Sequence, residues 1–170
     1  MSERFAFGRD EHGRDAFDGE VRHAVRPTTA LIGRLLMSSI FLVSGFHKLV
    51  DPSGTIAAMS SQGVPAPGVL LWIAAFAELA GGVALLTGFL TRLGALGLFL
   101  YLIPTTLVFH RFWDASGPMA MLQQANFLKN LTIMGGLLML VAHGPGRYSL
   151  DHKLHTTIHH HGPVGRRAPQ

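Results

Sequence analysis

Residues 71–88 read LWIAAFAELAGGVALLTG, and this run decides the fold because it is long and apolar enough to cross a bilayer as a helix. One carboxylate, Glu78, lies in its middle. Ionisable side chains inside a membrane are costly, so an intramembrane acid is a functional candidate. The positions three and four residues away on a helix are all small: Ala74, Ala75, Gly81 and Gly82. A face of small residues packs against another helix, so we expect Glu78 to meet groups on neighbouring helices.

The composition is that of an integral membrane protein. Apolar residues make up 48% of the chain, charged residues only 14%, and the mean hydropathy is +0.32. The chain has no cysteine, which excludes disulfides, cysteine-ligated metals and thiol redox chemistry within it. The calculated pI of about 10.1 does not indicate a nucleic-acid binder, because the arginines flank apolar segments or lie in the terminal regions.

Four apolar segments are long enough to span a bilayer. They lie at about 31–50, 69–90, 93–112 and 124–143. We therefore predict an all-α protein with a four-helix transmembrane domain over residues 29–146. Residues 1–28 are predicted to form a flexible cytoplasmic tail, and residues 147–170 a polar, histidine-rich cytoplasmic tail. The small and breaker-rich residues 53–68 favour a short interfacial helix and a turn.

The positive charges near the predicted helix ends indicate the topology. One side carries Arg22, Arg26, Arg34, Arg92, Arg147 and Lys153. The other side carries fewer basic residues, namely Lys48, Arg111 and Lys129. Because the cytoplasmic side of membrane proteins is enriched in lysine and arginine, we predict a multi-pass protein of the cytoplasmic membrane with both termini in the cytoplasm.

Two segments repeat a pattern. The motif F-H-[KR]-x-x-D occurs at 46–51 and again at 109–114, and Gly-Gly pairs occur at 81–82 and 135–136. This favours two helical hairpins of the same orientation, related by an axis along the membrane normal. Coincidence between leucine- and glycine-rich segments is the alternative.

A polar cluster is predicted in the outer half of the bundle. Glu78 lies about 13 Å along its helix from the outer side, and Lys129 about 9 Å along the fourth helix. Their similar depth predicts a pair between them. Other polar residues are expected nearby and are candidates for cofactor contacts: His47, Lys48, His110, Asn126 and Asn130.

Two interpretations of this cluster are open. In one, Glu78 and Lys129 form a buried pair that fixes helix register. In the other they are catalytic: Glu78 accepts or relays a proton, and Lys129 holds an oxygen of a bound quinone. No metal site is predicted, because His47 and His110 are read as interfacial donors. The histidines of the C-terminal tail are read as solvated: His152, His155, His159, His160 and His161.

An ordered set of motifs between Gly33 and Asp151 resembles the DoxX family of small four-helix bacterial membrane proteins. The motifs are Ser44-Gly45-Phe46-His47-Lys48-Leu49 with Asp51-Pro52, Gly63-Val64-Pro65, Glu78-Leu79-Ala80-Gly81-Gly82 with Leu85-Leu86-Thr87-Gly88, Thr91-Arg92, Phe109-His110, Lys129-Asn130-Leu131 with Gly135-Gly136, and Gly144 to Asp151. The resemblance implies a four-helix bundle in the cytoplasmic membrane. It also implies kinship with the membrane subunit of thiosulfate:quinone oxidoreductase and with actinobacterial membrane oxidoreductase assemblies linked to thiol stress.

The leading hypothesis is a redox-associated membrane subunit that binds quinone or a similar small molecule. Its expected partners are the bilayer, soluble or membrane redox proteins and a second copy of the chain, and no nucleic acid. The main alternative is a noncatalytic membrane anchor or assembly factor for a redox or stress-response complex. A small-solute transporter is a further alternative. The sequence is compatible with an enzymatic and with a noncatalytic role.

Overall fold

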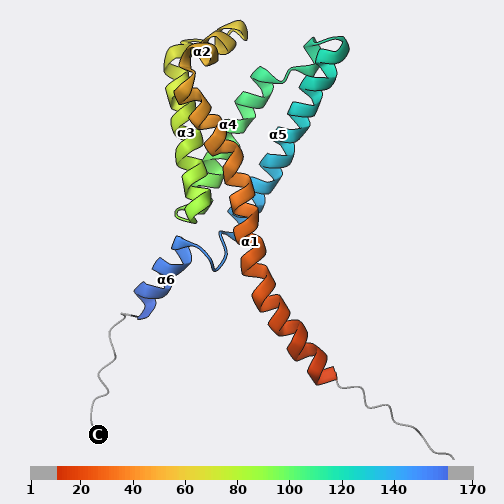
Figure 1. Cartoon of the computed structure of the whole chain (residues 1–170), viewed down its shortest axis with the longest axis vertical. Coiled ribbons are helices and arrows are strands. Elements are labelled where there is room, and N and C mark those ends of the chain that lie inside the picture. Colours follow the sequence, from red (N-terminus) through yellow and green to blue (C-terminus); the bar gives the residue numbers. More distant parts are fainter. Residues whose placement is uncertain (1–10, 161–170) are drawn as a thin grey trace, which may run out of the picture.

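A computed structural model describes residues 11–160, with side chains for residues 27–157. Its elements are α1 (Glu11–Val50), α2 (Pro52–Ser61), α3 (Pro67–Thr87), α4 (Thr91–Phe109), the 3-10 turn η1 (Phe112–Asp114), α5 (Gly117–His143) and α6 (Leu150–His160) (Figure 1). Within the described residues, the segments long and apolar enough to span a membrane are Pro27–Val50, Pro67–Thr87, Thr91–Asp114 and Gly117–His143. The predicted all-α, four-helix membrane fold is confirmed.

Helix α1 starts earlier than the sequence analysis expects. Residues 11–28, predicted as part of a flexible tail, continue α1 as helix beyond the apolar span. Charges of opposite sign four residues apart, such as Arg14 with Asp18 and Asp18 with Arg22, favour a helix in this polar stretch. Residues 1–10 of the predicted tail lie outside the described part.

The helices after the third span also differ from the prediction. Helix α5 begins at Gly117, although the sequence analysis places the fourth helix at about 124, because Pro118 is well suited to the first turn of a helix. The predicted C-terminal tail contains α6. Of its histidines, His161 lies outside the described residues, and the side chains of His159 and His160 are not described.

The four spanning helices pack as two pairs. Helix α1 packs along α3, α4 packs along α5, and α3 joins the pairs through its contact with α4. This pairing agrees with the predicted hairpin repeat. In Figure 1, α1 and α5 lie close together toward the end that carries α6 and diverge toward the end that carries α2. We call these the α6 end and the α2 end.

Glycines bring α1 and α3 close together. A Cβ atom added to Gly45 of α1 would lie 2.8 Å from Leu79 Cγ, and one added to Gly82 of α3 would lie 2.9 Å from Leu42 Cγ. By contrast, Gly97 has nothing within 4 Å of an added Cβ. The small face of residues 71–88 is therefore a helix-packing face, as predicted.

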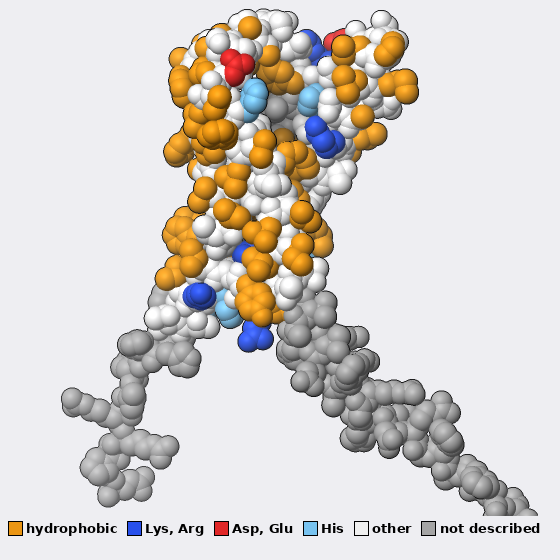
Figure 2. Space-filling view, viewed as in Figure 1, with side chains coloured by type: hydrophobic (Ala, Val, Ile, Leu, Met, Phe, Trp, Pro, Cys, Tyr) orange, Lys and Arg blue, Asp and Glu red, His pale blue; other side chains and the backbone are white. Residues whose placement is uncertain are grey.

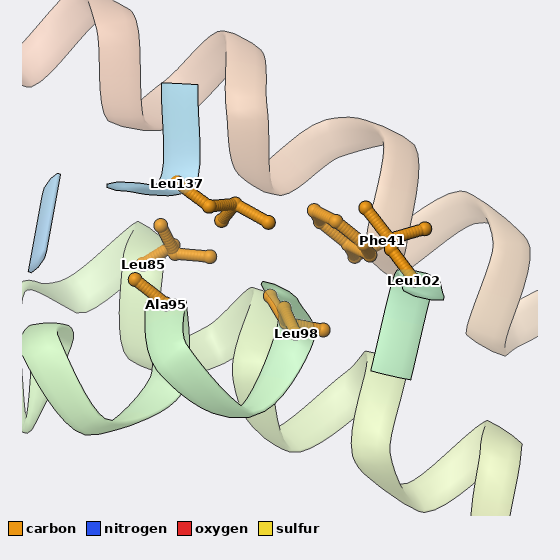
Figure 3. Close-up of a cluster of buried hydrophobic side chains, with 6 residues drawn as sticks. All are labelled: Phe41, Leu85, Ala95, Leu98, Leu102 and Leu137. Carbon is orange, nitrogen blue, oxygen red and sulfur yellow. The ribbon is translucent and has the colours of Figure 1, made fainter. Parts of the chain in front are cut away.

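A cluster of buried apolar side chains lies between all four spanning helices (Figure 3). It consists of Phe41, Leu85, Ala95, Leu98, Leu102 and Leu137. Large apolar side chains cover much of the exterior, as Figure 2 shows. An exterior of this kind is suited to lipid, and the bilayer is the environment of these four helices.

The α6 end is closed by the segment that follows α5. Asp151 accepts hydrogen bonds from the backbone N–H groups of Leu90 (2.8 Å) and Thr91 (3.1 Å), so it caps the start of α4 from 60 residues away along the chain. Leu90 itself has a φ of 50°, a left-handed conformation unfavourable for a leucine. The two hydrogen bonds from Asp151 help to hold this strained turn.

Arg34 holds the same segment from the other side. The residue is 1% exposed, and its guanidinium donates to the carbonyl oxygens of Pro145 (3.0 Å) and Tyr148 (2.6 Å). Gly88 makes room for it, since an added Cβ there would collide with the guanidinium. Residues 145–151 are therefore part of the bundle and not the beginning of a free tail.

Candidate functional site

Glu78 lies buried between three helices with three hydrogen-bond donors. The side chain is 4% exposed. Lys48 Nζ of α1 lies 2.7 Å from Oε2 and 3.0 Å from Oε1. Ser44 of α1 donates to Oε1 at 3.1 Å, and the Tyr101 hydroxyl of α4 donates to the same oxygen at 2.8 Å. A carboxylate with this many charge-assisted hydrogen bonds is held in one position.

The helix geometry explains why Lys48 reaches so far into the bundle. It lies in the last turn of α1, and helical side chains point back toward the N-terminus of their helix. Its ammonium therefore extends inward and also donates to Ser44 Oγ, one turn back, at 2.9 Å. The Lys48 side chain stays 17% exposed, so the ion pair lies at the boundary between the core and an accessible surface.

The predicted pair of Glu78 with Lys129 is wrong. Lys129 is exposed and donates to Asn126 Oδ1 of its own helix at 2.9 Å. Equal depth in the membrane does not make two residues neighbours. Helix α5 packs on α4, whereas α3 carries Glu78 and has α1 along its other side, so the ammonium that reaches the carboxylate comes from α1.

The other predicted residues do not form one cluster with Glu78. His110 Nδ1 lies 3.0 Å from Gln123 Oε1, and Asn130, which is buried, donates to Thr106 Oγ1 at 3.0 Å. Both contacts join α4 to α5. The expected single polar cluster is divided between the two helix pairs, and only Lys48 of the predicted residues bonds to Glu78.

A groove of about 460 Å³ runs along α1 beside the Lys48–Glu78 pair. It is lined by Ser39, Ile40, Val43, Ser44, His47, Lys48 and Thr55. Ile40 and Val43 are exposed on the apolar surface of α1, so a molecule dissolved in the lipid can reach the groove. Figure 2 shows a hollow at the α2 end with histidine side chains on both of its sides.

Ser44 connects the groove to the buried carboxylate. Its hydroxyl lines the groove, accepts a hydrogen bond from Lys48 and donates one to Glu78. Glu78 itself is not among the lining residues and lies behind Ser44 and Lys48. A ligand in the groove would therefore communicate with the carboxylate through these two side chains.

Ser44 and Tyr101 are site residues that were not predicted from the sequence. A signal for each is present. Ser44 precedes Lys48 by four residues, so both lie on one helix face. Tyr101 lies in the middle of a span, whereas the aromatic residues that line membrane interfaces occur near span ends. A tyrosine at mid-span needs a hydrogen-bond partner for its hydroxyl, and Glu78 is that partner.

Comparison with known proteins agrees with this architecture. Residues 29–111 match the family DoxX, and this region includes Lys48, Glu78 and Tyr101. The inner membrane protein YphA of Escherichia coli (strain K12) is 35% identical over 130 residues, which are 76% of this chain and 93% of that protein. The chain belongs to the DoxX family. This confirms the resemblance seen in the sequence motifs.

A second relative is also an inner membrane protein. The inner membrane protein YqjF of Escherichia coli (strain K12) is 40% identical over 124 residues, 73% of this chain and 90% of that protein. No solved structure matches the chain. With two inner membrane relatives and four spanning helices, this DoxX protein is a multi-pass membrane protein.

Proposed function

We propose that this DoxX protein binds a quinone or quinol from the membrane in the groove along α1, as a subunit of a redox system. One observation carries the proposal: a groove open to lipid is lined by a cation and a hydroxyl that both bond to a buried carboxylate. A register-fixing pair needs no such access from the lipid.

The groove suits the two chemical parts of a quinone. Exposed Ile40 and Val43 offer an apolar wall for the ring and the start of the isoprenoid tail. Lys48 offers a charged donor for a quinone oxygen. Ser44 Oγ, whose single O–H is donated to Glu78, can accept a hydrogen bond from a quinol hydroxyl, and His47 lies on the same lining. The volume of about 460 Å³ lies within the usual range for small-molecule sites. In this proposal Lys48 takes the role that the sequence analysis gives to Lys129.

The contacts support a proton path from quinol to Glu78. Oxidation of a quinol to a quinone releases two protons and two electrons. One quinol hydroxyl gives its proton to Ser44 Oγ while the Ser44 proton passes to Glu78 Oε1, 3.1 Å away. His47 on the groove lining accepts the second proton. Both electrons pass to a partner redox protein, and reduction of a quinone follows the same path in reverse.

Quinone retained by the purified protein tests the binding step. The wild-type chain, purified from membranes in mild detergent, should carry quinone that organic extraction and chromatography detect. Val43→Trp should fill the groove and remove most of it, whereas Val83→Trp, at an exposed position of α3, should not. Equal quinone in the two variants, or none in the wild type, would contradict the proposal.

The proton step is tested by Glu78→Gln against Glu78→Ala. Glutamine keeps the shape and most hydrogen bonds of Glu78 but cannot take up a proton. The Gln protein should therefore fold and retain quinone, yet lose quinol-dependent electron transfer in membranes that contain its partners. If Glu78 only fixes helix register, the Gln protein keeps that activity and the defects of the Ala protein follow its stability.

A further inference from the structure

A second cavity lies at the α6 end, opposite the quinone groove. Its volume is about 650 Å³. It is lined by Leu90, Arg92, Leu93, His143, Gly144, Pro145, Gly146, Arg147, Ser149, Asp151, His152 and His155. These residues come from the start of α4, the end of α5, the segment between α5 and α6, and α6 itself. Residues that the quinone proposal does not use therefore meet in one pocket.

The lining carries an excess of positive charge. Two arginines, Arg92 and Arg147, face one acid, Asp151. Both carboxylate oxygens of Asp151 are engaged by backbone N–H groups at the start of α4. Among residues 27–157, no carboxylate lies within ion-pair distance of either arginine. With respect to these described residues, both guanidinium groups are open to an anion.

The backbone is shaped to hold one of these arginines at the cavity. Gly144 is buried and has a φ of 78°, which favours glycine. An added Cβ there would lie 3.3 Å from Arg92 Nε and 3.4 Å from Arg92 Nη2. The guanidinium therefore lies directly over the glycine backbone, and a larger residue at this position would crowd it.

The rim of the cavity is apolar. Leu90 and Leu93 line it and are both exposed, at 52% and 65%. Leu93 lies in the first turn of a spanning helix, so this rim is at the edge of the lipid. Figure 2 shows basic and histidine side chains gathered at the α6 end below the apolar exterior. A ligand that fits both parts is an anion with a hydrocarbon portion.

We propose that this cavity binds the phosphate group of an anionic phospholipid. Arg92 and Arg147 donate to the phosphate oxygens, and Leu90 and Leu93 contact the first part of the acyl chains. The bound lipid would bridge the start of α4 and the segment before α6. The site is separate from the quinone groove, and its test does not depend on quinone binding.

The test uses the full chain purified in detergent and three additions. Phosphatidylglycerol should raise the thermal unfolding temperature in a saturable way. Phosphatidylcholine, which has a phosphate but no net charge, and inorganic phosphate, which has no acyl chain, should raise it much less. An equal effect of phosphatidylcholine would show that charge is not recognised, and an equal effect of inorganic phosphate would assign the site to free phosphate. Either result overturns the proposal.

Matched variants locate the site. The double variant with Arg92→Gln and Arg147→Gln should lower the affinity for phosphatidylglycerol by about tenfold or more, because two charge-assisted contacts are lost. The control pair Arg111→Gln and Lys129→Gln removes two exposed cations at the α2 end and should leave the affinity unchanged. An unchanged affinity in the arginine double variant overturns the assignment. If that variant does not fold, the comparison of the three additions on the wild-type protein still tests whether an anionic phospholipid is bound.

Discussion

Replacement of Lys48 by methionine tests the geometry of the buried site. Methionine keeps much of the aliphatic length of lysine and removes only the charge and its hydrogen bonds. Glu78 is 4% exposed, and in Lys48→Met it would keep only the donors Ser44 and Tyr101. Removal of one partner of a buried ion pair costs about 3–5 kcal/mol. We expect about 3 kcal/mol, the lower end of that range, because two donors remain and Lys48 is 17% exposed.

The double variant Lys48→Met with Glu78→Gln measures the coupling energy between the two side chains. Glu78→Gln alone leaves Lys48 bonded to Ser44 near the end of α1, where its ammonium can extend toward water, and we expect a loss of about 1.5–3 kcal/mol. The double variant removes both charges. Its loss should be smaller than the sum of the single losses by about 2 kcal/mol, within the range of coupling energies for residues in contact.

Unfolding of the protein by dodecyl sulfate in mixed micelles, followed by circular dichroism, measures these free energies. Lys129→Met is the matched control. Lys129 is exposed and bonded only to its own helix, so the change should cost no more than about 0.5 kcal/mol and add to Glu78→Gln without coupling. Equal losses in Lys48→Met and Lys129→Met, or simple additivity for Lys48 with Glu78, would refute the placement of the pair.

Three further results are expected. Gly82→Ala should lower stability by about 1–3 kcal/mol through overpacking between α1 and α3, whereas Gly97→Ala, which meets nothing, should be neutral or raise the melting temperature slightly. The backbone N–H of Gly54 holds the pKa of Asp51 below its usual value, so Asp51 stabilises α2 at neutral pH. This contribution to stability is lost as the pH falls through the lowered pKa. Asp51→Asn should remove that pH dependence from the amide exchange of α2. A single cysteine at Ser116 should react with an impermeant reagent in intact cells and one at Thr157 should not; the reverse pattern would overturn the predicted orientation.

The membrane fold could be predicted from the sequence because a bilayer demands long apolar helices. The run 71–88 and three similar segments meet that demand. Residues 11–28 are rich in charge and contain too few apolar residues for a core, so the sequence predicts a tail there. The attachment of residues 147–151, which the sequence assigns to a tail, cannot be predicted for a different reason. Arg34 and Asp151 tie this segment to the bundle through contacts between residues far apart in sequence, and no local pattern shows such contacts.

Half of the candidate site could be predicted. Glu78 was identified because a carboxylate in an apolar span is costly and needs a reason. Its partner Lys48 could not be predicted in this way, because the position of a residue along a helix fixes its depth in the membrane but not which helices are neighbours. Lys129 has a suitable height, yet Lys48 lies on the helix that packs against α3. The inward direction of a side chain in the last turn of α1 is the physical rule that favours Lys48.

A photoreactive quinone analogue would test the central claim most directly. The DoxX protein is labelled in native membranes, and peptide mass spectrometry then locates the attached quinone. The label should fall within residues 39–55, which contain the groove lining, and excess unlabelled quinone should prevent it. Label on α4 or α5, or label that excess quinone does not displace, would contradict binding of quinone beside Lys48 and Ser44.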